Sequence, residues 1–446
     1  MKRIFNILNK VYNNVGFQEC NTNKKYKPFL YCITQKIDTG ILIYNNFTCE
    51  LLFMDFEEYN RIYINYENND FSEERKYLIK HWFLIPNDYN DASIIYLFKQ
   101  TLRKNKYQKI NNISSYTILP TTNCNARCFY CYEKDYSKKN MTKETALDVV
   151  EYIKNTSNAN EKIFIRWFGG EPLFNGEIIN LICKSLNERA ISFVSTMTSN
   201  GYLFDKFNIN DIKNIWKLQQ VQITLDGLEN TYNNTKKYIY KDTKSPFYKV
   251  MDNIHLLLIN NIQVIVRLNI SSDNVDEIYE LINYLIIEFK KYNNFSVYCS
   301  LLFEYLDNDK LLYSKYVDLQ NYLKNNDLRW SYNLQRINNY HCMADDRKSV
   351  VITPEGNLTV CEHHIDDEII GNIYDSELNQ DILNNWSEQY YIDECNTCKL
   401  YPKCTLLKKC ISMKCTEEYR NYTKEELKKT MIISYQNYLK NKNNQN

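Results

Sequence analysis

Three closely spaced cysteines constrain this chain more than any other feature of its sequence. They lie in the run Cys124-Asn-Ala-Arg-Cys128-Phe-Tyr-Cys131. Thiolates bind soft metals and iron-sulfur clusters, and a four-iron cluster with only three protein ligands keeps one iron open for catalysis. Zinc sites usually contain two CxxC-like pairs, whereas no fourth Cys or His lies near this run. The run therefore predicts a 4Fe-4S cluster with an open iron, and a zinc knuckle or three buried thiols are the alternatives.

This CxxxCxxC run, with Tyr130 directly before its last cysteine, resembles the signature of the radical S-adenosylmethionine (radical SAM) superfamily. The resemblance implies that the open iron chelates the methionine end of S-adenosyl-L-methionine. It also implies that an electron from the cluster cleaves this cofactor to a 5'-deoxyadenosyl radical, which abstracts a hydrogen atom from the substrate. The protein would supply binding, orientation and protection from side reactions.

Length and charge limit the other function classes. A chain of 446 residues is long enough for two or three domains with their own cores. Its 55 Lys and Arg nearly balance its 54 Asp and Glu, so we expect neither a nucleic acid nor an anionic membrane as partner. We find no signal peptide and no apolar run of transmembrane length, and the sequence thus predicts a cytoplasmic protein.

Alternation of β-branched runs with helical patterns between Ser115 and Leu302 predicts parallel βα units. The expected strands are Tyr116 to Leu119, Ile163 to Phe168, Ile191 to Thr198, Val221 to Leu225, Val264 to Ile270 and Phe295 to Leu301. One expected helix begins after Thr142. Three others are expected to cover Gly176 to Glu188, Phe247 to Asn260 and Val275 to Phe289. Six such units predict an α/β fold, a partial (β/α)6 TIM-like barrel whose active site lies at the C-terminal ends of the strands. The cysteine run follows the first strand and so opens at that edge.

The chain ends differ from this central region. Strands at Phe29 to Ile37, Gly40 to Tyr44 and Glu50 to Met54, followed by three helical stretches, predict a small α+β N-terminal module. Its element order resembles the winged-helix peptide recognition domain of peptide-modifying enzymes, and a purely structural cap is the alternative. A helix is expected from Thr423, with Glu426 completing a capping box, and the tail at 439–446 is expected to be disordered. The predicted domains are 1–112 (N-terminal module), 113–330 (radical SAM core) and 331–446 (cysteine-rich iron-sulfur domain).

Two motifs after the strands resemble cofactor-binding segments of the superfamily. Gly169-Gly170-Glu171-Pro172 follows the second strand and matches a GGEP motif, which implies that these residues bind the ammonium group of the cofactor. An ordinary βα turn is the alternative. Ser199 and Asn200 end the third strand with short polar side chains that can bind ribose hydroxyls or a carboxylate.

The fourth strand ends at Asp226, in a segment that resembles the SLDG sequence of one branch of the superfamily. In that branch an Arg that pairs with the cofactor carboxylate follows. Lys236 stands at the corresponding position here. A lysine keeps the positive charge but cannot form the two parallel hydrogen bonds that an arginine guanidinium makes to a carboxylate. Arg267, on the fifth strand, is a rival for this role.

A second set of cysteines resembles the SPASM domain, a C-terminal extension that carries auxiliary 4Fe-4S clusters. The resemblance implies that one cluster is closed by Cys395, Cys398, Cys404 and Cys415. It implies that another is held by Cys342, Cys361 and Cys410, with its fourth ligand unspecified; five residues separate Cys404 from Cys410 where the family usually has three. A zinc ribbon at the Cys395 pair is the alternative. The remaining cysteines are expected to be small buried side chains, namely Cys20, Cys32, Cys49, Cys183 and Cys299.

Glu362 follows Cys361, at a position where SPASM enzymes that oxidise a side chain carry an acidic residue that removes a proton from the substrate. A solvated polar loop is the alternative, and His363 or His364 could supply the missing cluster ligand. The favoured function is modification of a ribosomally made peptide by hydrogen abstraction and oxidation or crosslinking, thioether formation included. The required partners would be the peptide or protein substrate and an external low-potential electron donor. The alternatives are a sulfatase-maturing enzyme that makes formylglycine, and a non-catalytic electron carrier or zinc scaffold.

Overall fold

The structure is a computed structural model that describes residues 1–5, 18–21, 23–65, 72–107, 112–241, 243–302, 310–328, 342–388, 391–410 and 415–443. It contains two compact units. The barrel unit comprises Ile110–Trp330 and Tyr340–Glu388, and the terminal unit combines Met1–Lys109 with Gln389–Asn446. The segment expected to form a third domain is thus divided between two units, and the domain boundaries stay a prediction.

Six parallel strands form the centre of the barrel unit. In spatial order they are β7 (Ser115–Ile118), β8 (Ile163–Trp167), β9 (Phe193–Ser199), β10 (Leu218–Leu225), β11 (Gln263–Ile270) and β12 (Phe295–Leu301), and each pairs with the next in parallel. The predicted partial barrel is therefore confirmed, because all six strands appear in the expected order and close to the expected bounds.

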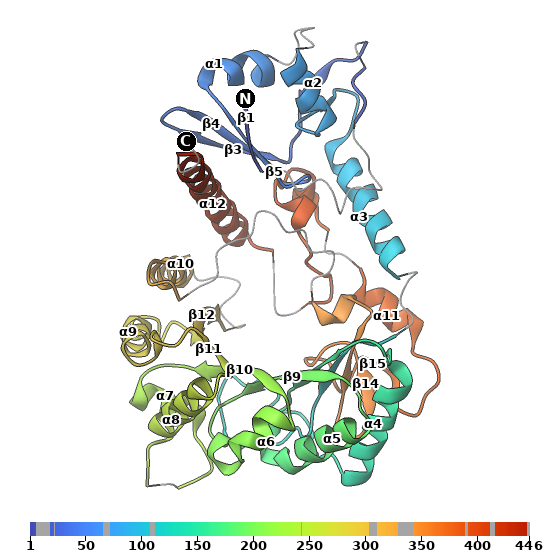
Figure 1. Ribbon diagram of the computed structural model, residues 1–446, viewed down its shortest axis with the longest axis vertical. Coiled ribbons are helices and arrows are strands. Elements are labelled where there is room, and N and C mark those ends of the chain that lie inside the picture. The colour runs from blue at the N-terminus through green and yellow to red at the C-terminus, as the bar shows by residue number, and fades with distance from the viewer. Residues whose placement is uncertain are drawn as a thin grey trace. The chain divides into compact units, whose positions relative to one another are not determined.

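Helices cover one face of this sheet (Figure 1). They include α4 (Lys143–Thr156), α5 (Gly176–Glu188), α6 (Ile209–Asn214), α8 (Pro246–Ile259) and α9 (Ile278–Phe289), followed by α10 (Lys310–Asn325). Thr142 caps α4 as expected, since its side chain accepts a hydrogen bond from the Thr145 backbone N–H. The short helix α7 (Glu229–Lys236) was not anticipated from the sequence.

Side chains along the strands alternate between a buried apolar face of the sheet and a polar face. On β11 the side chains of Val264, Val266 and Leu268 are fully buried, whereas Arg267 on the opposite face is half-buried. We call this second face the open face. Side chains that it carries are Arg166, Gln222, Thr224, Arg267, Tyr298 and Ser300.

Three further strands extend the sheet beyond β7. Strand β13 (Ser349–Ile352) pairs with β7 in parallel, and β14 (Asn357–Thr359) and β15 (Ile369–Asn372) continue antiparallel. Gly356 turns the chain between β13 and β14 with φ of +82°. This extension was not predicted. It is followed by α11 (Gln380–Trp386) and places the segment after Cys361 in the barrel unit.

The terminal unit is built on an antiparallel sheet of order β1 (Lys2–Phe5), β5 (Glu50–Met54), β4 (Gly40–Asn45) and β3 (Cys32–Ile37). Strands β3 and β4 form a hairpin, with Ile37 paired to Gly40 across a two-residue turn. Strands β2 (Tyr26–Pro28) and β6 (Leu84–Pro86) form a second small sheet. The helical segments are α1 (Phe56–Glu58), a π-helical turn (Tyr59–Ile64), α2 (Glu73–Lys80) and α3 (Asp91–Tyr107). The expected small α+β module is thus confirmed.

The last helix, α12 (Glu417–Asn443), packs on this sheet. Its side chains Leu427, Met431 and Tyr435 share a core with Ile33 and Phe53. The helix starts six residues before Thr423, so the predicted capping box at Thr423 is wrong. The Thr416 hydroxyl accepts from the Tyr419 backbone N–H at 3.1 Å and caps the helix instead. Because α12 continues to Asn443, the tail expected to be disordered is helical from 439 to 443; residues 444–446 lie outside the described residues.

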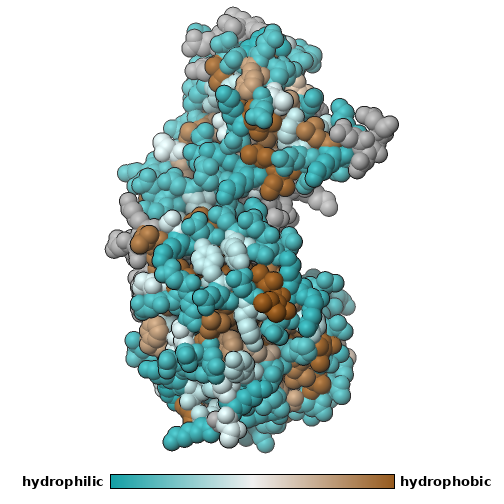
Figure 2. All heavy atoms as spheres, turned by 90° about the vertical axis from the view of Figure 1, so that its left-hand side faces the viewer, coloured by the Kyte–Doolittle hydropathy of each residue, from teal (hydrophilic) through white to brown (hydrophobic). Residues whose placement is uncertain are grey.

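No helix among the described residues is long and apolar enough to cross a membrane. On the face shown in Figure 2, hydrophilic side chains dominate and hydrophobic ones form small separate patches.

Candidate active site

The cysteine loop leaves the C-terminal end of β7, as predicted, and is fixed by backbone hydrogen bonds. The Arg127 N–H donates to the Lys236 carbonyl at 2.7 Å, and the Ile239 N–H donates to the Asn125 carbonyl at 2.9 Å. Helix α7, which ends at Lys236, therefore holds the middle of the loop against the end of the fourth strand.

All three thiols of the loop are partly buried. Burial raises the pKa of Cys124 to about 12, and the neighbouring Glu171, Cys128 and Cys131 add to this rise. Burial also raises the pKa of Cys128, while the positive charge of Lys236 opposes the rise. The thiols therefore lie within electrostatic range of one another, in surroundings that favour their neutral form unless a positively charged metal centre binds them.

This donor set fits the cluster that the motif implies. The three thiols of the loop match a cluster with one open iron, and the fully buried Nδ2 of Asn125 has no hydrogen-bond partner in the described chain. Among the described residues, no three His, Cys, Asp or Glu side chains are grouped to hold one metal ion. A four-iron cluster does not need such convergence, because each thiolate binds a different iron.

Glu171 is fully buried and joins two of the motifs. Its Oε1 accepts from the Ser199 hydroxyl at 2.9 Å and from the Leu173 N–H at 3.1 Å, and its Oε2 accepts from the Asn200 N–H at 2.8 Å. Burial raises the pKa of Glu171 to about 7, although these hydrogen bonds oppose the rise. The carboxylate thus organises the end of the third strand, and only part of its acceptor capacity is left for a ligand.

Asn200 links this group to the cysteine loop. Its Nδ2 donates to the Asn125 Oδ1 at 2.7 Å and lies 3.9 Å from the Cys124 Sγ. The two glycines of the GGEP motif pack on the same loop: a Cβ at Gly169 would lie 2.2 Å from the Thr121 carbonyl oxygen, and Gly169 has φ of +123°. The glycines are therefore required for contact with the start of the cysteine loop.

Asp226 and Lys236 form a buried ion pair under the loop. The Lys236 Nζ lies 3.0 Å from the Asp226 Oδ2 and 3.0 Å from the Tyr130 hydroxyl, which itself donates to the Asp226 Oδ1 at 2.6 Å. Burial is the largest single effect and lowers the pKa of Lys236, but Asp226, Tyr130, Cys128 and Tyr232 together outweigh it and hold this pKa well above its ordinary value. Asn269 also donates to Asp226, at 3.1 Å. Lys236 is thus already paired with a carboxylate of the protein.

Arg267 lies away from this group, on the open face. Its Nη2 donates to the Ser300 Oγ at 3.1 Å. Nearby, the Tyr298 hydroxyl donates to the Gln222 Oε1 at 2.9 Å. Burial raises the pKa of Tyr298, and the charge of Arg267 opposes the rise. The open face therefore carries a polar group that is separate from the buried ion pair of Lys236.

Glu362 faces the same open face. Its Oε1 lies 3.6 Å from Nη1 of Arg166 on β8, and 16% of its side chain is exposed. The ring of the adjacent His363 contacts the Tyr132 ring, with centroids 4.0 Å apart and ring planes tilted by 40°. Burial lowers the pKa of His363, Glu362 opposes this, and His364 and Arg267 lower it further. Glu362 thus extends toward the sheet and is not a fully solvated loop residue.

The auxiliary cysteines fall into two sets. Cys395, Cys398, Cys404 and Cys415 lie within electrostatic range of one another in the terminal unit, as the raised pKa values of Cys395 and Cys398 show after the leading effect of burial. Arg420 donates to the Cys415 Sγ at 3.2 Å. Cys342 and Cys361 belong to the barrel unit, whereas Cys410 belongs to the terminal unit, so this second group stays a prediction.

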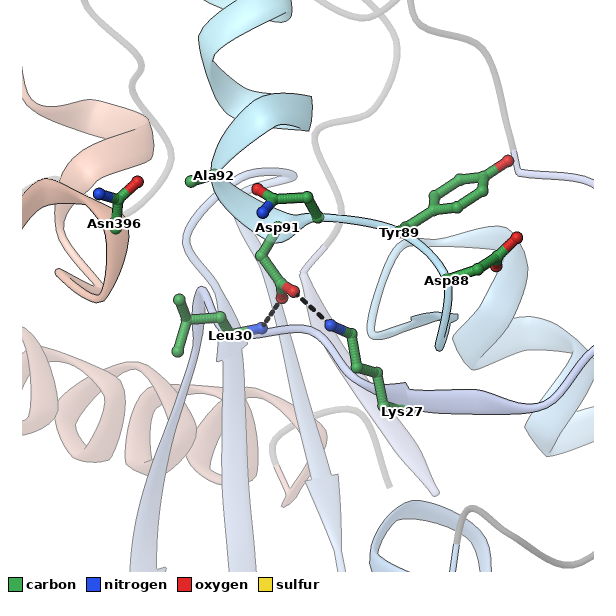
Figure 3. A pocket seen from close by; sticks show the side chains of 8 residues that line it. Lys27, Leu30, Asp88, Tyr89, Asp91, Ala92 and Asn396 are labelled. Carbon is green, nitrogen blue, oxygen red and sulfur yellow. Dashed lines mark hydrogen bonds and ion pairs between the residues drawn. The ribbon is translucent and has the colours of Figure 1, made fainter.

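Two cysteines of this set belong to the core of the terminal unit. Cys395, Cys398 and Tyr401 pack with Tyr31 and Phe29. Between its cysteines, Asn396 lines a pocket of about 420 Å³ at the start of α3, where Asp91 accepts from the Leu30 N–H and pairs with Lys27 (Figure 3). Of the cysteines expected to be merely buried, four are buried and Cys20 is half-buried; the four are Cys32, Cys49, Cys183 and Cys299.

Sequence reasoning missed several residues of this site. Tyr130 was used only as a marker of the motif, and Asn125, Asn269 and Arg166 were not considered. Arg166 carried a signal, because it is the polar residue in an otherwise apolar predicted strand. The roles of Asn125 and Asn269 depend on contacts between distant segments, and no local pattern indicates them.

Comparisons with known proteins agree with this site. Residues 118–285 match the Radical SAM superfamily. The uncharacterized protein MJ0907 of Methanocaldococcus jannaschii is 30% identical over 178 residues, 38% of this chain and 57% of that protein. A GTP 3',8-cyclase of Clostridium perfringens is 32% identical over 186 residues, 40% of this chain and 53% of the cyclase. The chain therefore spans just over half the length of these two relatives.

A third relative and a solved structure extend the comparison. The radical SAM cyclopropyl synthase TigE of Paramaledivibacter caminithermalis is 26% identical over 197 residues, 41% of this chain and 38% of the synthase. The structure of native anSMEcpe with bound AdoMet and Cp18Cys peptide has a TM-score of 0.54 and 17% identity, covering 73% of this chain and 99% of that one. The match, the cysteine run and the fold agree, so residues 118–285 of this chain form a domain of the Radical SAM superfamily.

Proposed function

We propose that this protein is a radical SAM enzyme that modifies a ribosomally made peptide by hydrogen abstraction followed by oxidation or crosslinking. The observation that carries the proposal is the link made by Asn200 between the cysteine loop and Glu171. It joins three motifs from three different strands at one edge of the sheet, which is where a βα barrel builds its active site.

When bound, the cluster and S-adenosyl-L-methionine supply a 5'-deoxyadenosyl radical for hydrogen abstraction, and auxiliary clusters supply an acceptor for a further electron. The protein would bind and orient the cofactor through the group around Glu171, Ser199 and Asn200. Lys236, with its partners Asp226 and Tyr130, would determine the electrostatic potential at the cysteine loop.

Glu362 is the residue to which we assign the proton step. After a hydrogen atom has left a substrate carbon, forming a new bond or a carbonyl requires the loss of one proton and one electron. The Glu362 carboxylate follows Cys361 and faces Arg166 on the open face, which supports its use as the proton acceptor.

A peptide substrate is supported by the extent of the fold. The likeness to anSMEcpe, a structure that contains a peptide, covers 73% of this chain and so extends beyond the family-matched residues 118–285. The terminal unit also offers β3 at the edge of its sheet of described strands. We propose that this edge holds a leader segment of the substrate by strand addition.

Mass spectrometry of candidate substrates tests the proposal. The reconstituted protein, S-adenosyl-L-methionine and a chemical reductant are incubated with each short peptide encoded beside its gene, with GTP, and with a sulfatase peptide. We expect one adjacent peptide to lose two hydrogens while GTP is unchanged. Conversion of GTP would replace the peptide by a nucleotide substrate, and formylglycine in the sulfatase peptide would favour a sulfatase-maturing enzyme.

A further inference from the structure

The open face is more polar than the interior of a closed barrel. Interiors of closed barrels are filled by layers of bulky branched side chains. Here the register places Thr224, Arg267 and Tyr298 side by side on three neighbouring strands, and Gln222 bonds to Tyr298 across them. Half-buried polar side chains on this face indicate a surface that contacts a polar ligand.

Arg267 is the unusual member of this row. A guanidinium has five N–H donors, and the one hydrogen bond that Arg267 makes within the described chain is to the neutral Ser300 hydroxyl. Its Nε is fully buried and without a partner among the described residues. A half-buried positive charge without an anion is unfavourable, and an anionic ligand would relieve this.

Two other cations of the site are each paired with a carboxylate of the protein. Lys236 is paired with Asp226 at 3.0 Å, and Arg166 is paired with Glu362 at 3.6 Å. Of these three cations, Arg267 alone has no carboxylate within ion-pair distance among the described residues.

Its position along β11 separates it from the cysteine loop. Asn269 is the residue of this strand that reaches Asp226, and Arg267 lies two residues earlier, which is about 7 Å along a strand. Arg267 instead lies within electrostatic range of His363, the neighbour of Glu362. It is therefore better placed for a group of the substrate than for the cofactor.

We propose that Arg267 binds a carboxylate of the substrate on the open face. The inference rests on the proposed function, because it assumes a peptide substrate, and it assigns to that peptide an acidic side chain or a free C-terminus near the modified residue. A guanidinium binds a carboxylate through two parallel hydrogen bonds, which would also fix the orientation of the peptide.

Affinity selection with a defined set of peptides tests this inference without turnover. The set consists of short amidated peptides that carry Asp, Glu, Asn or Gln at each position in turn, with unamidated versions of the Asn and Gln members. The protein is reconstituted and loaded with S-adenosyl-L-methionine. We expect it to retain acidic or unamidated peptides about ten- to a hundredfold better than neutral ones. Asp and Glu members report a side-chain carboxylate, and unamidated members report a C-terminal one.

Two variants and one control assign the preference. Arg267→Gln should abolish it and leave cofactor binding, measured by equilibrium dialysis, unchanged. Arg267→Lys should keep an intermediate preference, because the charge remains and the fork is lost. Arg189→Gln is the matched control, since Arg189 pairs with Glu151 away from the open face and its removal should change neither property.

Three results would overturn the inference. The unchanged protein could show no preference for carboxylates, a result that does not depend on how the variants fold. Arg267→Gln could retain the full preference. It could also lose cofactor binding instead, which would make the cofactor the anion. Failure of the proposed function would be separate, since it would appear as absent peptide modification in the presence of normal carboxylate binding.

Discussion

The two units of the molecule hold cysteine sites of contrasting construction. In the barrel unit, the cysteine loop lies at the end of a parallel sheet and is fastened by polar contacts from the ends of neighbouring strands and α7. In the terminal unit, Cys395 and Cys398 are part of a hydrophobic core. The first arrangement leaves polar groups free for ligands, whereas the second uses its cysteines as packing.

Hydrogen bonds from side chains to backbone carbonyls connect the cysteine segment of the terminal unit to the N-terminal module. The Lys399 ammonium donates to the Cys32 carbonyl at 2.9 Å, and the Asn46 amide donates to the Lys399 carbonyl at 2.9 Å. The Lys99 ammonium donates to the Cys404 carbonyl at 2.5 Å. The cysteine segment and the N-terminal module thus fold as one body. A metal site at these four cysteines would stabilise that body, and one in the barrel unit would serve catalysis.

Among single substitutions, the largest effect is expected at Glu362, in the barrel unit. Glu362→Gln keeps size and hydrogen-bonding capacity but removes the proton acceptor, so modified peptide should fall by about two to four orders of magnitude. Cofactor cleavage should continue, because the cysteine loop is untouched. Quantifying peptide and 5'-deoxyadenosine in the same reaction checks this. Product formation at the parental rate would reduce Glu362 to a loop residue.

A smaller effect is expected for cofactor binding by the groups at the strand ends. Glu171→Ala and Lys236→Ala should weaken binding of S-adenosyl-L-methionine by about ten- to a hundredfold, because each removes a charged hydrogen-bonding group. Iron content should stay at the parental level, which separates this loss from loss of the cluster. Normal binding by Lys236→Ala together with weak binding by Arg267→Ala would move the carboxylate site to β11.

The edge of the terminal sheet should contribute about tenfold in peptide affinity. In a hairpin with a two-residue turn, Ile37 and Gly40 form the hydrogen-bonded pair, so the Lys36 N–H points away from β4. Lys36→Pro should therefore block an added strand while keeping the β3–β4 ladder. Lys36→Ala is the control. The measurement is the affinity of each variant for the precursor peptide that the protein modifies. Equal affinities of the two variants would leave the module as a structural cap.

The smallest effect on chemistry is expected at the embedded cysteines. Replacing Cys395 and Cys398 by Ala should remove about one of three clusters and lower the thermal midpoint of the terminal unit by on the order of 5 °C. Cofactor cleavage should persist. Cys183→Ala, a buried cysteine of the barrel unit outside both groups, should leave the iron content unchanged. An unchanged midpoint in the reconstituted double variant would contradict a stabilising role.

Local sequence signals predicted the barrel unit well and its additions poorly. The six strands alternate or run with β-branched residues, and helices such as α4 carry a cap and an apolar face, so their positions follow from nearby residues. Strands β13 to β15 are short and depend on pairing with β7, which no local pattern shows. The start of α12 was misplaced because two capping sequences lie within one stretch, and only packing on the terminal sheet selects Thr416.

The site was partly predictable for the same reason. Motif residues such as Cys124, Glu171 and Asp226 were found because their short segments resemble motifs of the radical SAM superfamily. Their partners were not, because Asn269 and Tyr130 reach Asp226 across the fold. The association of the Cys395 group with the N-terminal module likewise joins segments separated by more than 300 residues, as the bond from Lys399 to Cys32 illustrates.

The most direct test of this contrast is 5'-deoxyadenosine formation by three anaerobically reconstituted proteins. They are the parent, the variant with Cys124, Cys128 and Cys131 all replaced by Ala, and the variant with Cys395 and Cys398 replaced by Ala. We predict that the parent and the double variant cleave S-adenosyl-L-methionine, and that the triple variant does not. Full 5'-deoxyadenosine production by the triple variant, or a parent that binds zinc and no iron, would contradict the account.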